Sequence, residues 1–252
     1  MMIDIHSHIL PGLDDGSKSW DMTLAMCRLA IEDGITHIVA TPHADDTYAY
    51  SRDRIRDLVA ELDRKVRGQL AFSVGCDFHL SFENIEDAIT HPGRYTIASG
   101  QYLLVELSDY GIPPQVSDAL LRLRVAGMTP ILTHPERNGI LQRRPERVLE
   151  WVDAGCLVQV TASAVTGSWG DTSQRIAMWL FEQDAVHVLA SDAHDDKRRK
   201  PSLSEARRYV SKRFGPELAR SLVEDNPLAI ISGQPLPIPG QAPTANHGSR
   251  KA

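Results

Sequence analysis

Short apolar segments alternate with longer segments of helical periodicity along most of the 252-residue chain. Apolar runs such as LLVEL are short enough for strands, and runs of this kind are typical of a parallel sheet buried on both faces. We predict strands at Met2–His6, His37–Thr41, Ala71–Phe78, Tyr102–Leu107, Thr129–Thr133, Cys156–Thr161 and Val186–Ser191.

Helices are predicted between and after these strands, and most of them end at a glycine. Glycine adopts the left-handed conformation that often follows a helix C-terminus, and Ser19 is a suitable N-cap for the first helix. The predicted helices are Trp20–Asp33, Arg52–Arg67, Pro114–Ala126, Pro145–Ala154, Thr172–Gln183, Leu203–Phe214 and Pro216–Val223.

This order of elements predicts an α/β fold with a parallel sheet and right-handed crossovers. No glycine-rich phosphate-binding motif follows any predicted strand, so a nucleotide-binding sheet is disfavoured and a closed or nearly closed α/β barrel fits best. We assign residues 1–232 to one domain. Residues 233–252 are rich in proline, glycine and polar residues and are predicted to be a disordered tail.

Composition narrows the class of protein further. The hydrophobic fraction of 42% and the charged fraction of 24% are those of a globular protein, and a net charge of −6 gives no basic footprint for nucleic acid. The chain opens without the features of a signal peptide, and no apolar run reaches the ~18 residues of a membrane span. Three widely spaced cysteines without a CxxC motif favour a reducing compartment, so we expect a cytoplasmic protein without membrane insertion.

Histidines and carboxylates recur where the predicted strands end. In a barrel of parallel strands these ends open onto one face, which is where such folds carry their chemistry. In HSH the two imidazoles also fall on the same side of a strand, because side chains repeat every two residues. The candidate metal ligands are His6, His8, Asp15 in the first loop, His43, Asp77, Glu106, His134, Asp192 and His194.

These ligands are too many for one ion, and carboxylates are able to bridge two. Paired metal sites suit displacement at a phosphate ester, because the ions activate water and take up charge from the phosphoryl oxygens. Imidazole and oxygen ligands without thiolate favour manganese, iron or zinc. We therefore predict a metal-dependent phosphoesterase.

The motifs DIHSHILPGLDDG, TPH, VEL, THPERN and SDAH resemble those of the polymerase and histidinol phosphatase (PHP) superfamily. The resemblance is strongest to its bacterial protein-tyrosine phosphatases of capsule and exopolysaccharide synthesis, and covers roughly residues 2–232. It implies a distorted (β/α)7 barrel with two or three divalent ions, commonly Mn²⁺, and a metal-bound hydroxide that hydrolyses phosphotyrosine. The implied protein substrate is the C-terminal tail of a bacterial tyrosine kinase.

The resemblance also implies how the ligands are shared. His6, His8, Asp192 and one of Glu106 or Asp77 would surround one ion, and Asp15, His43 and His194 a second. The remaining ion would take the shared carboxylates and His134. The family usually has glutamate at Asp77, so occupancy of one site is open because the shorter side chain reaches less far.

The resemblance to this family also implies two arginines near the metals. Arg137 in HPERN matches one of them, and Arg199 in DDKRRKP matches the other, with Arg198 as the alternative. A guanidinium group binds two phosphate oxygens at once, which lysine cannot do.

Several other functions remain open at this point: a small-molecule phosphatase such as one for histidinol phosphate, a nuclease or amidohydrolase, and a binding protein that has lost its metal. A cysteine-based tyrosine phosphatase is excluded, because its loop requires Cys-x5-Arg. The residues six positions after Cys27, Cys76 and Cys156 are Asp33, Phe82 and Ala162.

Overall fold

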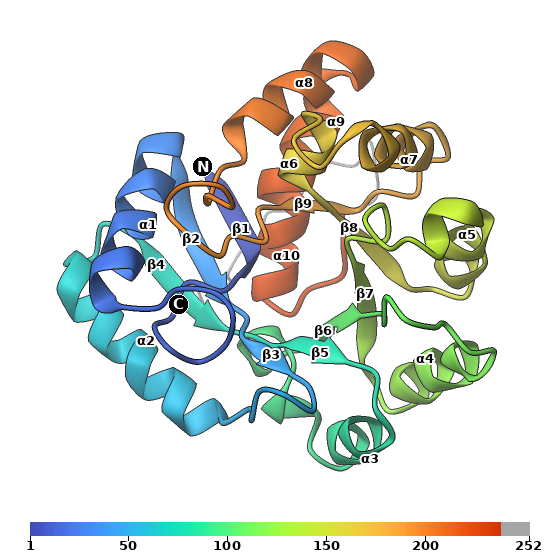
Figure 1. The fold of residues 1–252 in the computed structure, drawn as a ribbon, viewed down its shortest axis with the longest axis horizontal. Helices are drawn as coiled ribbons and strands as arrows, with labels where there is room; N and C mark the ends of the chain where they lie inside the picture. Colours follow the sequence, from blue (N-terminus) through green and yellow to red (C-terminus); the bar gives the residue numbers. More distant parts are fainter. Residues whose placement is uncertain (238–252) are drawn as a thin grey trace, which may run out of the picture.

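The computed structural model describes residues 1–237, in which parallel strands form a ring surrounded by helices (Figure 1). One sheet has the order β1 (Met2–Ser7), β2 (Ile35–Ala40) and β4 (Ala71–Val74). The second has the order β3 (His43–Ala44), β5 (Asp77–His79), β6 (Tyr102–Glu106), β7 (Thr129–Thr133), β8 (Leu157–Thr161) and β9 (Val188–Ala190).

The two sheets are joined where β3 continues β2 and β5 continues β4. The backbone amide of Gly75 donates to the carbonyl of Ala40 at 2.9 Å, and that of Asp77 donates to the carbonyl of Pro42 at 3.2 Å. These bonds carry the strand pairing across both interruptions. β2 and β3 therefore act as one interrupted strand of the ring, and β4 and β5 act as another.

The ring closes between β1 and the segment after β9. Ser7 and Ala193 form a parallel bridge, and the amide of Asp192 donates to the carbonyl of His6 at 2.9 Å. The amide of His8 donates to the carbonyl of Ala193 at 2.8 Å. The predicted distorted (β/α)7 barrel is thereby confirmed.

The predicted strand Ala71–Phe78 was wrong in one respect, because the structure divides it at Gly75 and Cys76 into β4 and β5. A Cβ atom at Gly75 would lie 3.0 Å from the side chain of Val39 and 3.1 Å from that of Thr41. Glycine allows this close approach between neighbouring strands. The interruption depends on contacts with a neighbouring strand, so the local apolar pattern does not predict it.

Local signals placed the first helix correctly: α1 runs from Trp20 to Asp33, with Ser19 accepting a hydrogen bond as N-cap and Gly34 at φ 89°. The predicted helix Pro216–Val223 ends early, at Arg220, and a π-helical turn at Ser221–Asp225 follows. Helices α3 (Phe82–Thr90), α6 (Ala162–Val165) and α10 (Asn226–Ile231) were not predicted. The other helices are α2 (Arg52–Val66), α4 (Gln115–Val125), α5 (Glu146–Asp153), α7 (Asp171–Glu182), α8 (Ser204–Phe214) and α9 (Pro216–Arg220).

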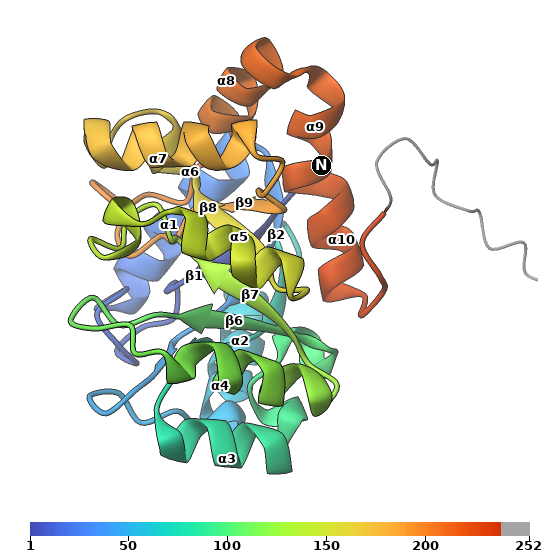
Figure 2. The ribbon, with the colours of Figure 1, turned by 90° about the vertical axis from the view of Figure 1, so that its right-hand side faces the viewer.

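An apolar cluster fills the inside of the barrel, including Ile5, Leu104 and Ile131 from three strands. Ile230 of α10 belongs to the same cluster, and Figure 2 shows α10 at the end of the barrel where the strands begin. A helix thus covers the amino ends of the strands, and polar chemistry is concentrated at their carboxyl ends.

Two residues of the predicted tail contact the barrel. The hydroxyl of Tyr102 donates to the carbonyl of Gln234 at 2.6 Å, and Leu236 packs against the inner apolar cluster. Residues 238–252, to which most of the disorder prediction applies, lie outside the described residues. The domain boundary at residue 232 stays a prediction.

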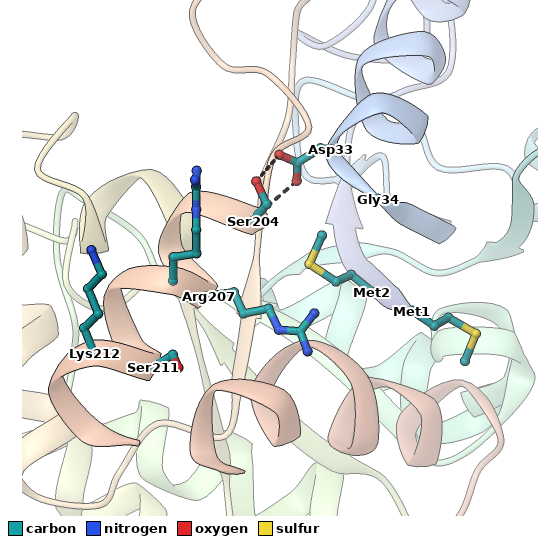
Figure 3. A pocket seen from close by; sticks show the side chains of 9 residues that line it. Met1, Met2, Asp33, Gly34, Ser204, Arg207, Ser211 and Lys212 are labelled. Atoms are coloured by element: carbon teal, nitrogen blue, oxygen red, sulfur yellow. Dashed lines mark hydrogen bonds between the residues drawn. The ribbon is translucent and has the colours of Figure 1, made fainter. Parts of the chain in front are cut away.

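The carboxylate of Asp33 fixes the start of α8. It accepts the amide of Leu203 at 2.6 Å. It also accepts the amide and hydroxyl of Ser204 at 2.9 and 2.6 Å (Figure 3). These bonds satisfy amides that lack partners within the helix. The surface groove beside them is lined by Met2 and Arg207, among others, and includes none of the predicted ligands. Between residues 1 and 237, no helix has the length and apolarity needed to cross a membrane.

Candidate metal centre

The predicted ligands meet at the carboxyl ends of the strands. His6 and His8 leave β1 side by side and are buried, and their Nε2 atoms are 3.2 Å apart. Two imidazole nitrogens that face each other at this distance in a buried site suit a shared cation or proton. The HSH spacing thus has the geometry that its strand periodicity predicted.

The ligand atoms fall into three groups within reach of single ions. In each group all ligand atoms lie within 4.8 Å of one another. His8, His43 and Asp77 each belong to two groups, so the short Asp77 side chain is shared between the group of His6 and the group of Glu106. The groups are His8, Asp15, His43 and His194; His6, His8 and Asp77; and His43, Asp77 and Glu106.

The remaining two ligands lie against these groups. Nε2 of His134 is 3.5 Å from Oε1 of Glu106, and Oδ1 of Asp192 is 3.4 Å from Nε2 of His6. All nine residues predicted from the sequence are therefore brought into one cluster. Their assignment to particular ions stays a prediction.

Buried atoms without partners indicate that the cluster suits cations. Neither carboxylate oxygen of Asp77 has a hydrogen-bond partner among the described residues, although Oδ2 lies 3.2 Å from Nε2 of His6. Nδ1 of His43 is likewise buried and unpartnered. Unpaired buried polar atoms are costly, and cations bound among them would satisfy these lone pairs. Oxygen and imidazole donors suit manganese, iron or zinc.

The backbone is unusual at two of the predicted ligands. His134 has φ 35° and Asp192 has φ 51°, a region that residues other than glycine seldom adopt. His134 directly follows β7 and Asp192 lies two residues after the end of β9, so each side chain enters the cluster from a sharp turn at the carboxyl end of a strand. Strained conformations of this kind concentrate at functional sites.

Two arginines converge on Asp192 from different loops. A terminal guanidinium nitrogen of Arg137 donates to Oδ2 of Asp192, and NH2 of Arg199 donates to the same oxygen at 2.6 Å. Arg198 is exposed, and its backbone amide donates to Asp195 at 2.6 Å. The arrangement favours Arg199 over Arg198 as the second arginine.

The sequence analysis missed Asp14, which orients two of the histidines. Its Oδ2 lies 2.7 Å from Nδ1 of His8 and accepts the amide of His43 at 3.2 Å. A carboxylate on the outer nitrogen of a ligating histidine fixes its tautomer and raises its basicity. Gly16 makes the turn possible, because a Cβ there would lie 2.2 Å from the carbonyl oxygen of His8.

Of two further buried polar residues, Gln159 contacts a candidate ligand. Oε1 of Gln159 lies 3.0 Å from Nδ1 of His6, and Glu136 accepts the amide of Thr161 at 2.9 Å. Glutamine within the apolar run LVQVT of β8 was a signal for such a role, since an interior strand position is rarely polar. Burial raises the pKa of Glu136 to about 7.

Burial and neighbouring charges raise the pKa of some histidines in the cluster and lower the pKa of another. Burial disfavours the protonated ring of His6, but Asp77 and Asp192 outweigh it and raise the pKa of His6 to about 9. Burial also disfavours the protonated ring of His43, but Asp15 and Asp77 outweigh it and raise the pKa of His43 to about 10. Burial and the neighbouring His8 lower the pKa of His194 to about 4. Without metal, the folded protein therefore holds protons on His6 and His43.

Thermal stability of the metal-free protein is expected to fall from about pH 6.5 to about pH 10. The raised pKa values of His6 and His43 contribute stability below the unfolded value of ~6.5, and this contribution is lost as pH approaches about 9 to 10. Thermal melts of EDTA-treated protein across this range test the expectation. The His6→Gln variant should show a shallower decline, and an unchanged or rising melting temperature in the parent protein would contradict it.

The sequence matches the family described as "Capsular polysaccharide synthesis, CpsB/CapC" over residues 2–232. The chain belongs to the CpsB/CapC family. One member, "Tyrosine-protein phosphatase CpsB" of Streptococcus pneumoniae, is 30% identical over 92% of this chain and 99% of its own length. The family assigned from the HSH, HPERN and SDAH motifs is thus confirmed.

Solved structures give the same relationship. A structure reported for YwqE from Bacillus subtilis and CpsB from Streptococcus pneumoniae, "unique metal-dependent tyrosine phosphatases", matches with a TM-score of 0.86. It is 29% identical and covers 93% of this chain and 96% of that one. Histidinol phosphate phosphatase from Lactococcus lactis matches at a TM-score of 0.55 with 13% identity, which shows a shared fold alone.

Proposed function

We propose that this protein is a metal-dependent protein-tyrosine phosphatase that uses manganese. The observation that carries the proposal is the histidine and carboxylate cluster with two arginines at its edge, in a member of the CpsB/CapC family. Divalent ions held by this cluster would lower the pKa of bound water and offset charge on the phosphoryl oxygens.

The remaining residues have distinct tasks in this proposal. Asp14 and Gln159 hold the rings of His8 and His6 in the tautomers that leave Nε2 free for a cation. Arg137 and Arg199 present guanidinium donors beside Asp192, where they would bind phosphoryl oxygens. These donors are fixed in advance, so little reorganisation is needed when charge develops on the phosphoryl group.

Phosphotyrosine is the favoured substrate class because its leaving group is a phenolate with a pKa of ~10. A phenolate departs with less help from a general acid than an alkoxide needs. We place the substrate on the C-terminal tail of a bacterial tyrosine kinase that controls capsule or exopolysaccharide assembly. The cysteines are all free, which suits the reducing cytoplasm.

Matched peptides that differ only in phosphotyrosine or phosphoserine test the proposed substrate class. We expect manganese-loaded protein to hydrolyse the phosphotyrosine peptide with the larger kcat/KM. Histidinol phosphate belongs in the same assay, because it represents the rival small-molecule phosphatase. Equal rates on both peptides, or a preference for histidinol phosphate, would contradict the proposal.

Alkylating agents are expected to leave turnover intact. All three cysteines are buried, and burial raises the pKa of Cys27 to about 12 and that of Cys156 to about 11. Thiols with raised pKa values supply little of the reactive thiolate at neutral pH. Iodoacetamide treatment followed by mass spectrometry and activity assay tests this. Inactivation by modification of one cysteine, with protection by phosphate, would point to a thiol nucleophile instead.

A further inference from the structure

Trp169 lies beside the arginines of the site. It belongs to the loop between α6 and α7, between two glycines with left-handed backbone, Gly167 at φ 90° and Gly170 at φ 85°. The side chain remains partly accessible, with 37% of the residue exposed. A large aromatic ring is thus held at the edge of a cluster of charged groups.

The ring of Trp169 contacts both guanidinium groups of the site. Cζ of Arg137 lies 3.8 Å from the ring centre, and Cζ of Arg199 lies 5.5 Å from it. Both distances are within the ~6 Å range over which a cation is attracted to an aromatic face. Tryptophan is also the aromatic residue that attracts cations most strongly.

Asp192 also contacts both arginines, but it differs from Trp169 in its effect on the donors available to phosphate. Its carboxylate occupies guanidinium N–H donors, and it is also a predicted metal ligand. An aromatic face attracts the guanidinium plane and leaves its N–H edges free. The Nε atoms of Arg137 and Arg199 are buried without acceptors among the described residues, so both groups retain unused donors.

We propose that Trp169 is a positioning residue that holds Arg137 and Arg199 in place for the phosphoryl group. This proposal rests on the proposed phosphatase function. The two arginines come from separate loops, and long side chains lose considerable rotamer freedom when fixed. Because the ring contacts both arginines, their side chains are already partly ordered, and less conformational entropy is lost when phosphate binds.

The affinity of metal-loaded protein for inorganic phosphate, measured by calorimetry, tests this role without relying on turnover. We expect Trp169→Ala and Trp169→Leu to weaken phosphate binding about tenfold at unchanged metal content, the effect of losing one close and one distant cation–aromatic contact. Trp169→Phe should recover most of the affinity, because a phenyl face still attracts cations. KM should rise for aryl and alkyl phosphates alike.

Trp20→Leu is a matched control. The ring of Trp20 also lies near a cation, with Nζ of Lys65 4.8 Å from its centre, and Trp20 belongs to none of the ligand groups. Phosphate affinity should be unchanged in this variant. Unchanged phosphate affinity in Trp169→Ala would overturn the proposal, as would a loss confined to aryl substrates, which would place the ring against the leaving group. If the parent protein binds phosphate but does not hydrolyse phosphotyrosine, the proposed function fails, and the phosphate measurements still decide the role of Trp169.

Discussion

His6→Ala is expected to remove bound metal and turnover together. His6 is completely buried, lies within 3.4 Å of the facing atoms of His8, Asp77 and Asp192, and belongs to one of the three ligand groups. Loss of an ion removes both water activation and charge neutralisation. We therefore expect kcat to fall by more than the ~10³-fold upper value for loss of a single preorganised donor.

His91→Ala serves as the control for this variant. Its ring is largely exposed and lies 3.1 Å from the carboxylate of Asp87 on the surface of α3. Elemental analysis and turnover should match the parent protein for His91→Ala, and both should fall for His6→Ala. A His6→Ala variant that folds and retains its full metal content and activity would remove His6 from the centre.

Arg137→Ala is expected to lower kcat/KM for phosphotyrosine peptides by about 10²-fold without loss of metal. The guanidinium group contacts Asp192 but supplies no metal-binding atom, and removing a positive charge near the cluster does not weaken its attraction for cations. Arg137→Lys should recover little, because an ammonium group lacks the planar fork that binds two oxygens.

Arg143→Ala is the matched control, because Arg143 is exposed and follows Arg137 by six residues in the same connection. Its kcat/KM should equal that of the parent protein. A fully active Arg137→Ala variant would exclude Arg137 from phosphoryl recognition. Metal content measured in each variant separates loss of recognition from loss of the centre.

The sequence predicted features that depend on local or periodic signals. The α1 boundaries followed from Ser19 and Gly34, because caps act within one helical turn. The clustering of the candidate ligands could be predicted because parallel strands end on a shared face, so His6 and Asp192 were expected together despite their separation in the chain. The choice between Arg198 and Arg199 required the structure, since adjacent residues of one loop point in different directions.

Features that depend on distant packing could not be predicted in the same way. Asp14 was passed over in favour of its neighbour Asp15, and only the fold shows that Asp14 is the buried partner of His8. Gln159 lies next to His6 although 153 residues separate them in the chain. The interruption at Gly75 depends on contacts with Val39 and Thr41. Each of these features depends on contacts that exist only in the folded chain, so local sequence patterns do not predict them.

The most direct test of the account is phosphotyrosine turnover measured against the number of ions bound per chain. Metal-free protein prepared with EDTA would be titrated with manganese, with bound metal and kcat measured on the same samples. We predict no turnover without metal, and a rise in kcat that follows occupancy of the cluster formed by His6, His8, Asp15, His43, Asp77, Glu106, His134, Asp192 and His194. Full phosphotyrosine turnover by protein shown to contain no metal would contradict the account.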